Sequence, residues 1–340
     1  MHVLFHDNFV SERGTTTTIK HYARELVRLG HDVSISYDAT SPSNVPEVVD
    51  GLKTEFNLAP YVSHRSFKEL DGRFDAAYFR KSGVKDGKIF ENTPSLVHCV
   101  FQNYDPHGVW YGYISEWLAR TMSSQAKTIR SRFRARMAER AGCLNASEFD
   151  WLPSCTALPE ATAFERSSWD VPETAFVVLR YGAWSSFDVP SVRQAVSRAL
   201  EARPDMYFIG VNTPPFTDHP RARFLPAVYT EQEKANLLAS ADLFLHARSN
   251  GESFGLAILE ALQSGVPILS WSGGEDQNHV ALLRDLDCLF SDAAELHHSL
   301  LHWSASMFDA GRDARLAAGN AYSPEVVGAQ LEGVLKRIAN

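Results

Sequence analysis

Short hydrophobic runs alternate with segments of helical periodicity along almost the whole chain. Hydrophobic runs bounded by turn residues predict β-strands, and hydrophobic residues three or four positions apart predict one-sided helices. The predicted strands lie near 2–6, 33–37, 75–79, 95–101 and 109–114 in the first half, and near 175–181, 206–210, 242–246 and 266–270 in the second. Strands that alternate with helices are typical of parallel sheets covered by helices. The pattern therefore predicts an α/β protein.

The predicted helices and one proline-containing segment divide the chain. The helices lie near 15–29, 190–202, 231–240 and 254–264, and a terminal helix begins after Ser323 with Pro324 at its first position. Residues 151–159 carry two prolines among small residues, which is typical of an extended linker and places the boundary near 155–172. We expect an N-terminal domain of residues 1–155, a C-terminal domain of residues 156–321 and a terminal helix in 322–340 that can return to the first domain.

Composition narrows the class of protein. The chain has 33 basic and 41 acidic side chains and a net charge of −8, which argues against a nucleic-acid-binding protein. Residues 1–155 hold 19 basic and 18 acidic residues, whereas residues 156–340 hold 14 and 23. Four scattered cysteines without a C-x-x-C pair indicate neither a disulfide framework nor a zinc site. The first residues are expected to form a strand rather than a signal peptide, so we expect a cytoplasmic protein.

The turn after the first predicted strand lacks the glycines of a dinucleotide site. A Rossmann fingerprint needs G-x-G-x-x-G at this point, but residues 7–15 hold one glycine, Gly14, and no Walker loop is present. An NAD-binding site is therefore not expected. The turn at Gly14 could still bind an anion through backbone amides, or it could be a tight turn without a ligand.

The second half carries the more informative pattern. A predicted strand ends near His246 and is followed by a polar loop, Glu252, Ser-Phe-Gly and a hydrophobic helix that contains Glu260. Ligands bind at the carboxyl ends of strands in open α/β sheets. The amino end of the following helix can donate amide N–H groups to a diphosphate, and Glu260 can accept a hydrogen bond from a neutral hydroxyl such as that of ribose.

This order of residues resembles the retaining glycosyltransferases of the B-type fold (GT-B), in the large family 4 marked by E-x7-E. Other similar segments are Gly14, Arg28–Val33, Tyr113–Trp117, Trp151–Ser154, Phe224–Pro226, Ser272–Gly274 and Cys288–Asp292. The resemblance implies two Rossmann-like doubly wound domains that face a cleft. It also implies retaining transfer of a sugar from a nucleotide-diphosphate sugar to a glycan, lipid-linked or other hydroxyl acceptor, in the synthesis of surface polysaccharide or glycoconjugates.

The resemblance also implies roles for particular residues. Glu252 would contact the transferred sugar, and His98 would lie near it, the alternative being a structural histidine at a strand end. The expected donor-binding residues are Glu260, Arg248, Arg180, Ser253, Phe254, Gly255 and Gly14. No metal ligand and no cofactor are expected, since the nucleotide sugar is a substrate and no D-x-D motif follows a predicted strand.

One departure from the family concerns the charge that neutralises the leaving diphosphate. The family places an arginine and a lysine in G-R-x-x-x-x-K-G, but this chain has Ala183 at the arginine position and no lysine. Arg180, Arg248 or helix amides would have to stabilise the phosphates instead. Each arginine could also form a structural ion pair.

Residues 119–141 are strongly basic. Seven Lys or Arg side chains occur there with one acidic residue, and Ile129, Phe133 and Met137 recur at helical spacing. Such a helix suits a peripheral contact with anionic lipid at the inner membrane face, or an anionic acceptor. The alternative is a solvated basic helix that packs its hydrophobic stripe on the N-terminal domain.

Two other functions stay open at this point. One is a nucleotide-sugar epimerase or phosphorylase of the GT-B fold. The E-x7-E motif, which begins at E-S-F-G and precedes S-G-V-P, favours a glycosyltransferase over this alternative. The other is a non-catalytic nucleotide-sugar-binding relative, which the missing arginine and lysine make plausible.

Overall fold

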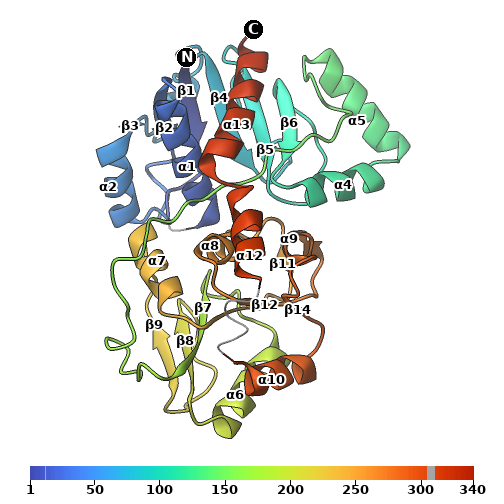
Figure 1. Cartoon of the computed structure of the whole chain (residues 1–340). Coiled ribbons are helices and arrows are strands. Elements are labelled where there is room, and N and C mark those ends of the chain that lie inside the picture. Colours follow the sequence, from blue (N-terminus) through green and yellow to red (C-terminus); the bar gives the residue numbers. More distant parts are fainter. Residues whose placement is uncertain (12, 305–310) are drawn as a thin grey trace. The chain divides into compact units, whose positions relative to one another are not determined.

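A computed structural model describes residues 1–11, 13–304 and 311–340. The chain divides into two compact units (Figure 1). Unit 1 consists of Met1–Thr156 together with Ser323–Asn340, and unit 2 consists of Ala157–Tyr322. Each unit contains a six-stranded sheet whose neighbouring strands are all parallel. The α/β class predicted from the alternation of strands and helices is therefore confirmed.

The first strand of the chain lies in the middle of the sheet of unit 1. Its spatial order is β3 (Asn57–Leu58), β2 (Asp32–Ser36), β1 (His2–His6), β4 (Ala76–Lys81), β5 (Ser95–Cys99), β6 (Trp110–Tyr113). The chain runs outward from β1 in one direction and then returns to pair β4 with the other side of β1. The carboxyl ends of β1 and β4 therefore flank the topological switch point, where ligands bind in open α/β sheets.

Six described helices belong to unit 1. They are α1 (Gly14–Arg28), α2 (Pro46–Glu55), α3 (His64–Lys68), α4 (Glu116–Gln125), α5 (Ile129–Arg140) and α13 (Pro324–Ala339). Helix α1 ends before Gly30, which adopts a φ of 85° that other residues rarely tolerate. Helix α13 begins as the sequence predicts, with the Ser323 hydroxyl accepting from the amide of Val326 and Pro324 at the first position.

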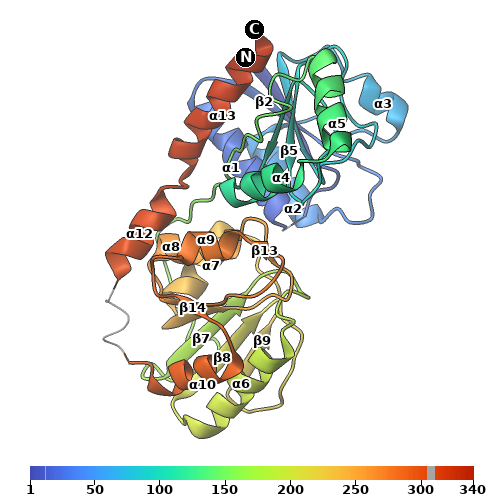
Figure 2. The ribbon, with the colours of Figure 1, turned by 90° about the vertical axis from the view of Figure 1, so that its right-hand side faces the viewer.

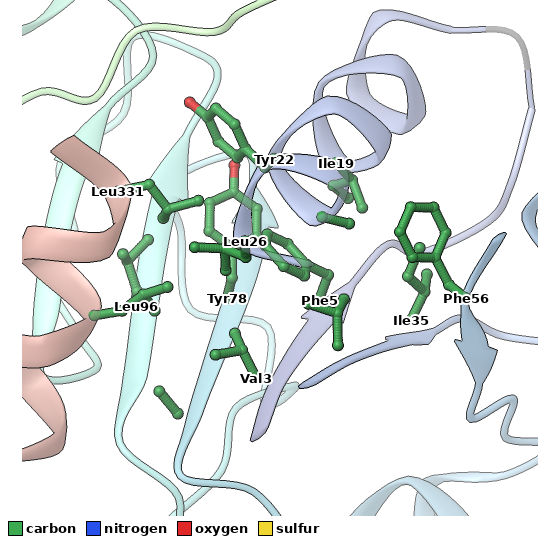
Figure 3. Packing of buried hydrophobic residues seen from close by; sticks show 14 of the residues in the cluster. Val3, Phe5, Ile19, Tyr22, Leu26, Ile35, Phe56, Tyr78, Leu96 and Leu331 are labelled. Carbon is green, nitrogen blue, oxygen red and sulfur yellow. The ribbon is translucent and has the colours of Figure 1, made fainter. Parts of the chain in front are cut away.

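Helix α13 completes the core of unit 1. Its residues Leu331 and Leu335 are fully buried in the same cluster as Tyr22 and Leu96 (Figure 3). Figures 1 and 2 show α13 alongside α1, and the two helices are so close that a Cβ atom at Gly328 would lie 2.0 Å from the Cγ of Glu25. The terminal segment is thus an integral part of unit 1.

The sheet of unit 2 has the same organisation. Its spatial order is β14 (Leu289–Phe290), β12 (Ile268–Trp271), β10 (Leu243–His246), β7 (Phe176–Tyr181), β8 (Met206–Val211), β9 (Ala222–Leu225). A separate two-stranded sheet pairs β11 (Gly251–Glu252) with β13 (Asp276–Gln277). The switch point lies between β7 and β10, so the residues that follow these two strands lie at the expected ligand-binding edge.

The helices of unit 2 cover its sheet. They are α6 (Pro190–Ala202), α7 (Glu231–Ala239), α8 (Leu256–Ser264), α9 (Asn278–Leu283), α10 (Ala293–His302) and α12 (Arg312–Asn320). Helix α8 contributes Ile258, Ala261 and Leu262 to one core cluster, whereas α6 and α10 contribute to another. Because α8 is held between the sheet and α12, its amino end has a fixed position beside β11.

The basic segment 119–141 forms parts of two helices, α4 and α5, which lie together beside the edge strand β6 (Figure 1). The side chains of Ile129, Phe133 and Met137 are 87%, 64% and 46% exposed, while Ala135 and Ala138 are buried. The alternative in which the hydrophobic stripe packs on the domain is therefore wrong. In the parts of the chain that the structure describes, no helix has the length and apolarity needed to span a membrane.

Candidate active site in unit 2

Glu252 is the centre of a charged cluster after β10. It ends β11, and its side chain is 20% exposed. The Nη1 atom of Arg248 donates to Oε2 of Glu252 at 3.0 Å, and Nε2 of His246 lies 3.4 Å from Oε1. His246 ends β10, so the switch point of the sheet and the loop after it bring these three side chains together. Of the three, the sequence predicts Glu252 and Arg248 as site residues, but not His246.

Two further groups orient this cluster. Nδ1 of His246 lies 2.9 Å from the hydroxyl of Ser270 on β12. The buried His279 on α9 accepts from the backbone N–H of Glu252 through Nδ1 at 3.3 Å, and its Nε2 lies 3.0 Å from the carbonyl of Trp271. A carbonyl can only accept, so this second contact requires a proton on Nε2 and leaves Nδ1 as the acceptor. His279 thus fixes the backbone on which the Glu252 carboxylate is mounted.

The charges around Glu252 keep it ionised. Burial raises its pKa, but the hydrogen bond and charge of His246, together with the charge of Arg248, outweigh burial and bring the pKa below its ordinary value. Burial, together with the charge of His246, lowers the pKa of His279 to about 4. At neutral pH the cluster therefore presents a carboxylate and a guanidinium, with His279 uncharged.

The amino end of α8 lies directly after Glu252. Gly255 precedes the helix with a φ of 99°, and no side chain caps the helix there. Phe254 is buried against the ring of Tyr322, and its carbonyl accepts from the Nδ2 group of Asn278. A helix that begins without a side-chain cap offers its first amides to an anion. The predicted segment Ser253–Gly255 therefore stands at an anion-binding position, with Phe254 serving as the packing anchor.

Glu260 lies two turns further along α8 in a different environment. It is 1% exposed, and its carboxylate accepts from Nζ of Lys234 at 2.7 Å and from the hydroxyl of Tyr181 at 2.7 Å. Lys234 belongs to α7 and Tyr181 ends β7, so three separate elements meet at this carboxylate. Sequence reasoning missed both partners, because only the packing of α7 and α8 on the sheet brings them together.

Arg180 is buried among polar groups of two loops in unit 2. It is 3% exposed, and its guanidinium donates to the carbonyls of Asn212 and Ala183, and to the hydroxyls of Thr213 and Ser186. These acceptors hold the loops after β7 and β8. These hydrogen bonds occupy both terminal nitrogens of Arg180 and favour the structural role, while a contact of Arg180 with the donor phosphates stays a prediction.

Arg248 remains available for an anion. Its side chain is 38% exposed, and its contact with Glu252 uses Nη1. The loop that carries it is fixed by Asp188, whose carboxylate accepts from the backbone N–H and the hydroxyl of Ser249. Arg248 is therefore the predicted cation that the geometry favours.

Unit 1 contains a second polar cluster at its own switch point. Asp7 follows β1 and accepts from Arg13 and from the hydroxyl of Thr16 on α1. Arg80 on β4 is 6% exposed and donates to the hydroxyl of Ser154, but its Nε and Nη1 atoms have no hydrogen-bond partner among the described residues. Buried donors without a partner are uncommon and point to a missing water or ligand group.

The other two residues predicted in unit 1 lie near this cluster. His98 on β5 is completely buried, and its Nδ1 atom lies within hydrogen-bond distance of the hydroxyl of Tyr78, which stays protonated because burial raises its pKa. Burial and the charge of Arg80 lower the pKa of His98 to about 3, so its ring is neutral. Gly14 is exposed and begins α1, where no side-chain cap is present. A contact of His98 or Gly14 with the donor stays a prediction.

Among residues 1–11, 13–304 and 311–340, no group of three or more His, Cys, Asp or Glu side chains is arranged to hold a metal ion.

Comparison with known protein families gives a match to the second unit. Residues 220–276 match the family model described as "Glycosyl transferases group 1". This stretch contains His246, Arg248, Glu252, Lys234 and Glu260, which are five of the residues in the two clusters around α8, whereas Tyr181 and His279 lie outside it. None of the curated proteins is similar enough to this chain to be matched.

Comparison with solved structures covers almost the whole chain. A glycosyltransferase from Rickettsia africae ESF-5 matches with a TM-score of 0.67 and 13% identity, covering 99% of this chain and 98% of that chain. Alr3699/HepE from Anabaena, in complex with UDP and glucose, matches with a TM-score of 0.64, 14% identity and coverage of 99% and 100%. WaaG, a glycosyltransferase involved in lipopolysaccharide biosynthesis, matches with a TM-score of 0.57, 15% identity and coverage of 98% and 99%. The fold is that of the GT-B glycosyltransferases.

Proposed function

We propose that this protein is a retaining glycosyltransferase that transfers a sugar from a nucleotide-diphosphate sugar to a hydroxyl acceptor. The observation that carries the proposal is the position of Glu252, held ionised between His246 and Arg248 directly before the uncapped amino end of α8. The match of residues 220–276 to the glycosyltransferase family supports the same function.

Unit 2 is the proposed donor-binding unit. The first amides of α8 and the free side of Arg248 would bind the diphosphate, because both present donors at the same end of the helix. Glu260 would bind a ribose hydroxyl beside Tyr181 and Lys234. The Anabaena protein of similar fold has been crystallised with UDP-glucose, which makes UDP sugars the first donors to test.

The proposed chemistry follows from the charges at this site. The bond between the anomeric carbon and the diphosphate oxygen breaks, and a bond to the acceptor oxygen forms on the same face while the acceptor proton passes to the departing phosphate. Negative charge develops on the diphosphate, and Arg248 with the α8 amides would stabilise it by preorganised hydrogen bonds. The ionised Glu252 would stabilise the positive charge that develops on the sugar. No cofactor and no divalent cation take part in this scheme.

Unit 1 is the proposed acceptor-binding unit. Its switch point carries Asp7 and Arg80, and the Nε and Nη1 atoms of Arg80, which have no hydrogen-bond partner among the described residues, could donate to an acceptor molecule. A glycan or lipid-linked acceptor and a role in surface polysaccharide or glycoconjugate synthesis are the corresponding proposals. His98 is retained in this scheme as a neutral group near the sugar.

A binding screen followed by a transfer assay tests the proposal. A nucleotide sugar that binds at a concentration one hundred times its Kd should stabilise the folded protein by about 2.7 kcal/mol, visible as a rise in melting temperature. The bound donor should then be transferred to a hydroxyl acceptor with the anomeric configuration retained, as read by NMR of the product. An inverted product would contradict the retaining mechanism, and stabilisation by no nucleotide would contradict the donor site.

A non-catalytic nucleotide-sugar-binding protein is the second candidate. The hydrogen bonds of Arg180 to loop carbonyls and hydroxyls favour this candidate. Of the two predicted arginines, they leave Arg248 as the one with a partly exposed side chain for the phosphates. Binding without transfer or donor hydrolysis would identify this case. Conversion of the donor to an epimer, or its cleavage by phosphate, would identify an epimerase or a phosphorylase.

A further inference from the structure

Several buried donors of unit 1 have no hydrogen-bond partner within the described chain. They come from the start of α1 and from the end of β4: Nε of Arg13, the hydroxyls of Thr15 and Thr18, and both Nε and Nη1 of Arg80. Buried polar groups in folded proteins are almost always hydrogen-bonded. Donors that the chain itself does not satisfy remain available to a ligand that accepts hydrogen bonds.

Arg80 is a buried cation without an acidic ion-pair partner in the described chain. It is the last residue but one of β4, it is 6% exposed, and its Nη2 atom donates to the hydroxyl of Ser154 at 3.2 Å. A guanidinium has five N–H donors and keeps its charge in proteins. A buried charge is costly unless it is paired, so the environment of Arg80 favours an anion.

The described side chains around Arg80 leave one positive charge uncompensated. Asp7 follows β1, the strand that pairs with β4, and Arg13 donates to its carboxylate. Burial and the like charge of Arg80 lower the pKa of Arg13, so the two guanidinium groups lie near each other. Burial also raises the pKa of Asp7, which weakens its compensation of the second cation. Two cations therefore share one carboxylate among these side chains.

The start of α1 adds to the positive potential at this point. Thr16 in its first turn donates to Asp7, so this end of the 15-residue helix lies beside the same carboxylate. No side chain caps the helix, and a helix amino end carries a partial positive charge. Gly14 is exposed and the side chain of Arg13 is 30% exposed, so the cluster adjoins solvent on this side.

We propose that the acceptor carries an anionic group, a carboxylate or a phosphate, and that Arg80 binds this group through Nε and Nη1. The inference rests on the proposed glycosyltransferase function and names the class of its acceptor: an acidic sugar or a sugar phosphate. Both anions offer several oxygens to one guanidinium, and charge-assisted hydrogen bonds of this kind are about twice as strong as neutral ones. The bound anion would supply the negative charge that the described side chains lack.

Two other ligands satisfy the site less well. A neutral sugar hydroxyl can accept from one N–H group of Arg80, but it brings no charge to a buried cation. The donor diphosphate brings charge, but unit 2 already offers Arg248 and the uncapped start of α8 for it. An anionic acceptor is the ligand that accounts for both the unpaired donors and the uncompensated charge of Arg80.

The thermal stability of the ligand-free protein gives the first test. Arg80→Met replaces a buried, uncompensated charge by an apolar side chain, so the melting temperature should rise by about 3 °C. Arg166→Met is the matched control, because Arg166 is 12% exposed and donates to the carbonyls of Ser240 and Glu173 and to the carboxylate of Asp242. Its loss should lower the melting temperature. A lower melting temperature of Arg80→Met would show that the chain already compensates this charge and would overturn the proposal.

Calorimetric sugar binding to the full chain gives the second test. Glucuronate or glucose 6-phosphate should bind the parent about tenfold more tightly than glucose, because the anion pairs with Arg80. In Arg80→Met this preference should disappear, and in Arg80→Lys part of it should remain, since an ammonium restores the charge but not the planar guanidinium. The tighter of the two acidic sugars identifies the group as a carboxylate or a phosphate. Equal affinities of the parent for all three sugars, or an unchanged preference in Arg80→Met, would overturn the proposal.

Nucleotide binding separates this inference from the proposed function. Arg80→Met should bind UDP as tightly as the parent does, because the proposed donor site belongs to unit 2. Weaker UDP binding by Arg80→Met would assign Arg80 to the donor diphosphate and overturn the inference. Failure of the sugar test alone would leave a glycosyltransferase with a neutral acceptor. Absence of both nucleotide binding and transfer would contradict the proposed function, whereas a preference for acidic sugars would still stand as a property of unit 1.

Discussion

Helix α8 joins two carboxylates of the same chemical type in contrasting environments. Glu252, before the helix, is partly exposed and meets a guanidinium and an imidazole from its own loop and strand. Glu260, inside the helix, is buried and meets an ammonium and a phenol from other elements. The first carboxylate is 20% exposed, whereas the second is buried and ties α7 and β7 to α8.

Glu252 and Glu260 show that two glutamates at a fixed spacing need not have the same role. A partly exposed carboxylate paired with a partly exposed cation contributes less to stability than a buried pair does, and it can be devoted to chemistry. A buried and paired carboxylate is different, because loss of one partner leaves an uncompensated charge in the protein interior. Substitutions at the two positions should therefore separate activity from stability.

The largest effect is expected at Glu252. Glu252→Gln keeps the shape of the side chain but removes its charge, so turnover should fall about 10³-fold through loss of electrostatic stabilisation of the transition state. The free energy of unfolding should change by less than about 1 kcal/mol, since the side chain is partly exposed. Steady-state kinetics and chemical denaturation measure the two quantities. Parent-like turnover would contradict the catalytic assignment.

The next effect is expected at the inner carboxylate. Lys234→Met removes the ammonium from the buried Glu260 and should lower the free energy of unfolding by about 3 kcal/mol, at the lower end for a buried pair because Lys234 is partly exposed. Lys336→Met is the matched control, because its pair with Glu332 lies at the surface and should contribute almost nothing. Denaturant unfolding of both variants gives the comparison. Equal free energies of unfolding for Lys234→Met and Lys336→Met would contradict the stabilising role of the buried pair at Glu260.

Acid should lower the free energy of unfolding through His279, which accepts a hydrogen bond from the backbone of Glu252. Its pKa is about 4 in the folded protein and about 6.5 when unfolded, so the unfolded chain binds the proton more readily. The stability that His279 contributes is present above pH 6.5 and is lost as the pH falls toward 4. Between pH 7 and pH 5 the loss should be about 2 kcal/mol. The free energy of unfolding of His279→Asn should therefore fall by about 2 kcal/mol less than that of the parent over this interval, as measured by denaturant unfolding at each pH. Equal pH dependence of the two proteins would contradict a buried neutral His279.

The smallest effect is expected at Arg248. Arg248→Met should lower turnover about tenfold with little change in stability, because the side chain is partly exposed and its partner Glu252 remains near His246. Arg248→Lys should restore part of the loss, since a cation returns without the planar guanidinium. Full activity of Arg248→Met would leave the α8 amides alone as phosphate ligands.

Much of the fold was predictable from local patterns. Buried parallel strands such as Phe176–Tyr181 are hydrophobic on both faces, and turns and helix caps such as Ser323 with Pro324 are short-range signals. The position of Glu252 was predictable for a related reason, because the carboxyl end of a parallel strand determines where the following loop lies.

The remainder depends on contacts between distant parts of the chain. No local sequence pattern indicates that Lys234 or Tyr181 contacts Glu260. The sequence around an arginine such as Arg180 also does not indicate whether its hydrogen-bond acceptors are phosphates or loop carbonyls. For α5, the periodicity predicts an apolar stripe, but the choice of buried face was made by the small side chains of Ala135 and Ala138, which allow close packing.

The return of α13 to unit 1 has a consequence for the order of synthesis. The ribosome completes residues 1–156 long before Leu331 and Leu335 exist, so the surface formed by Tyr22 and Leu96 stays uncovered while residues 157–322 are made. At typical elongation rates of about 5–20 residues per second this interval is roughly ten to thirty seconds. Unit 2 is continuous in sequence and can fold as soon as it emerges. The first unit to be synthesised is thus the last to be finished, and the apolar side chains that α13 covers are without this cover during that interval.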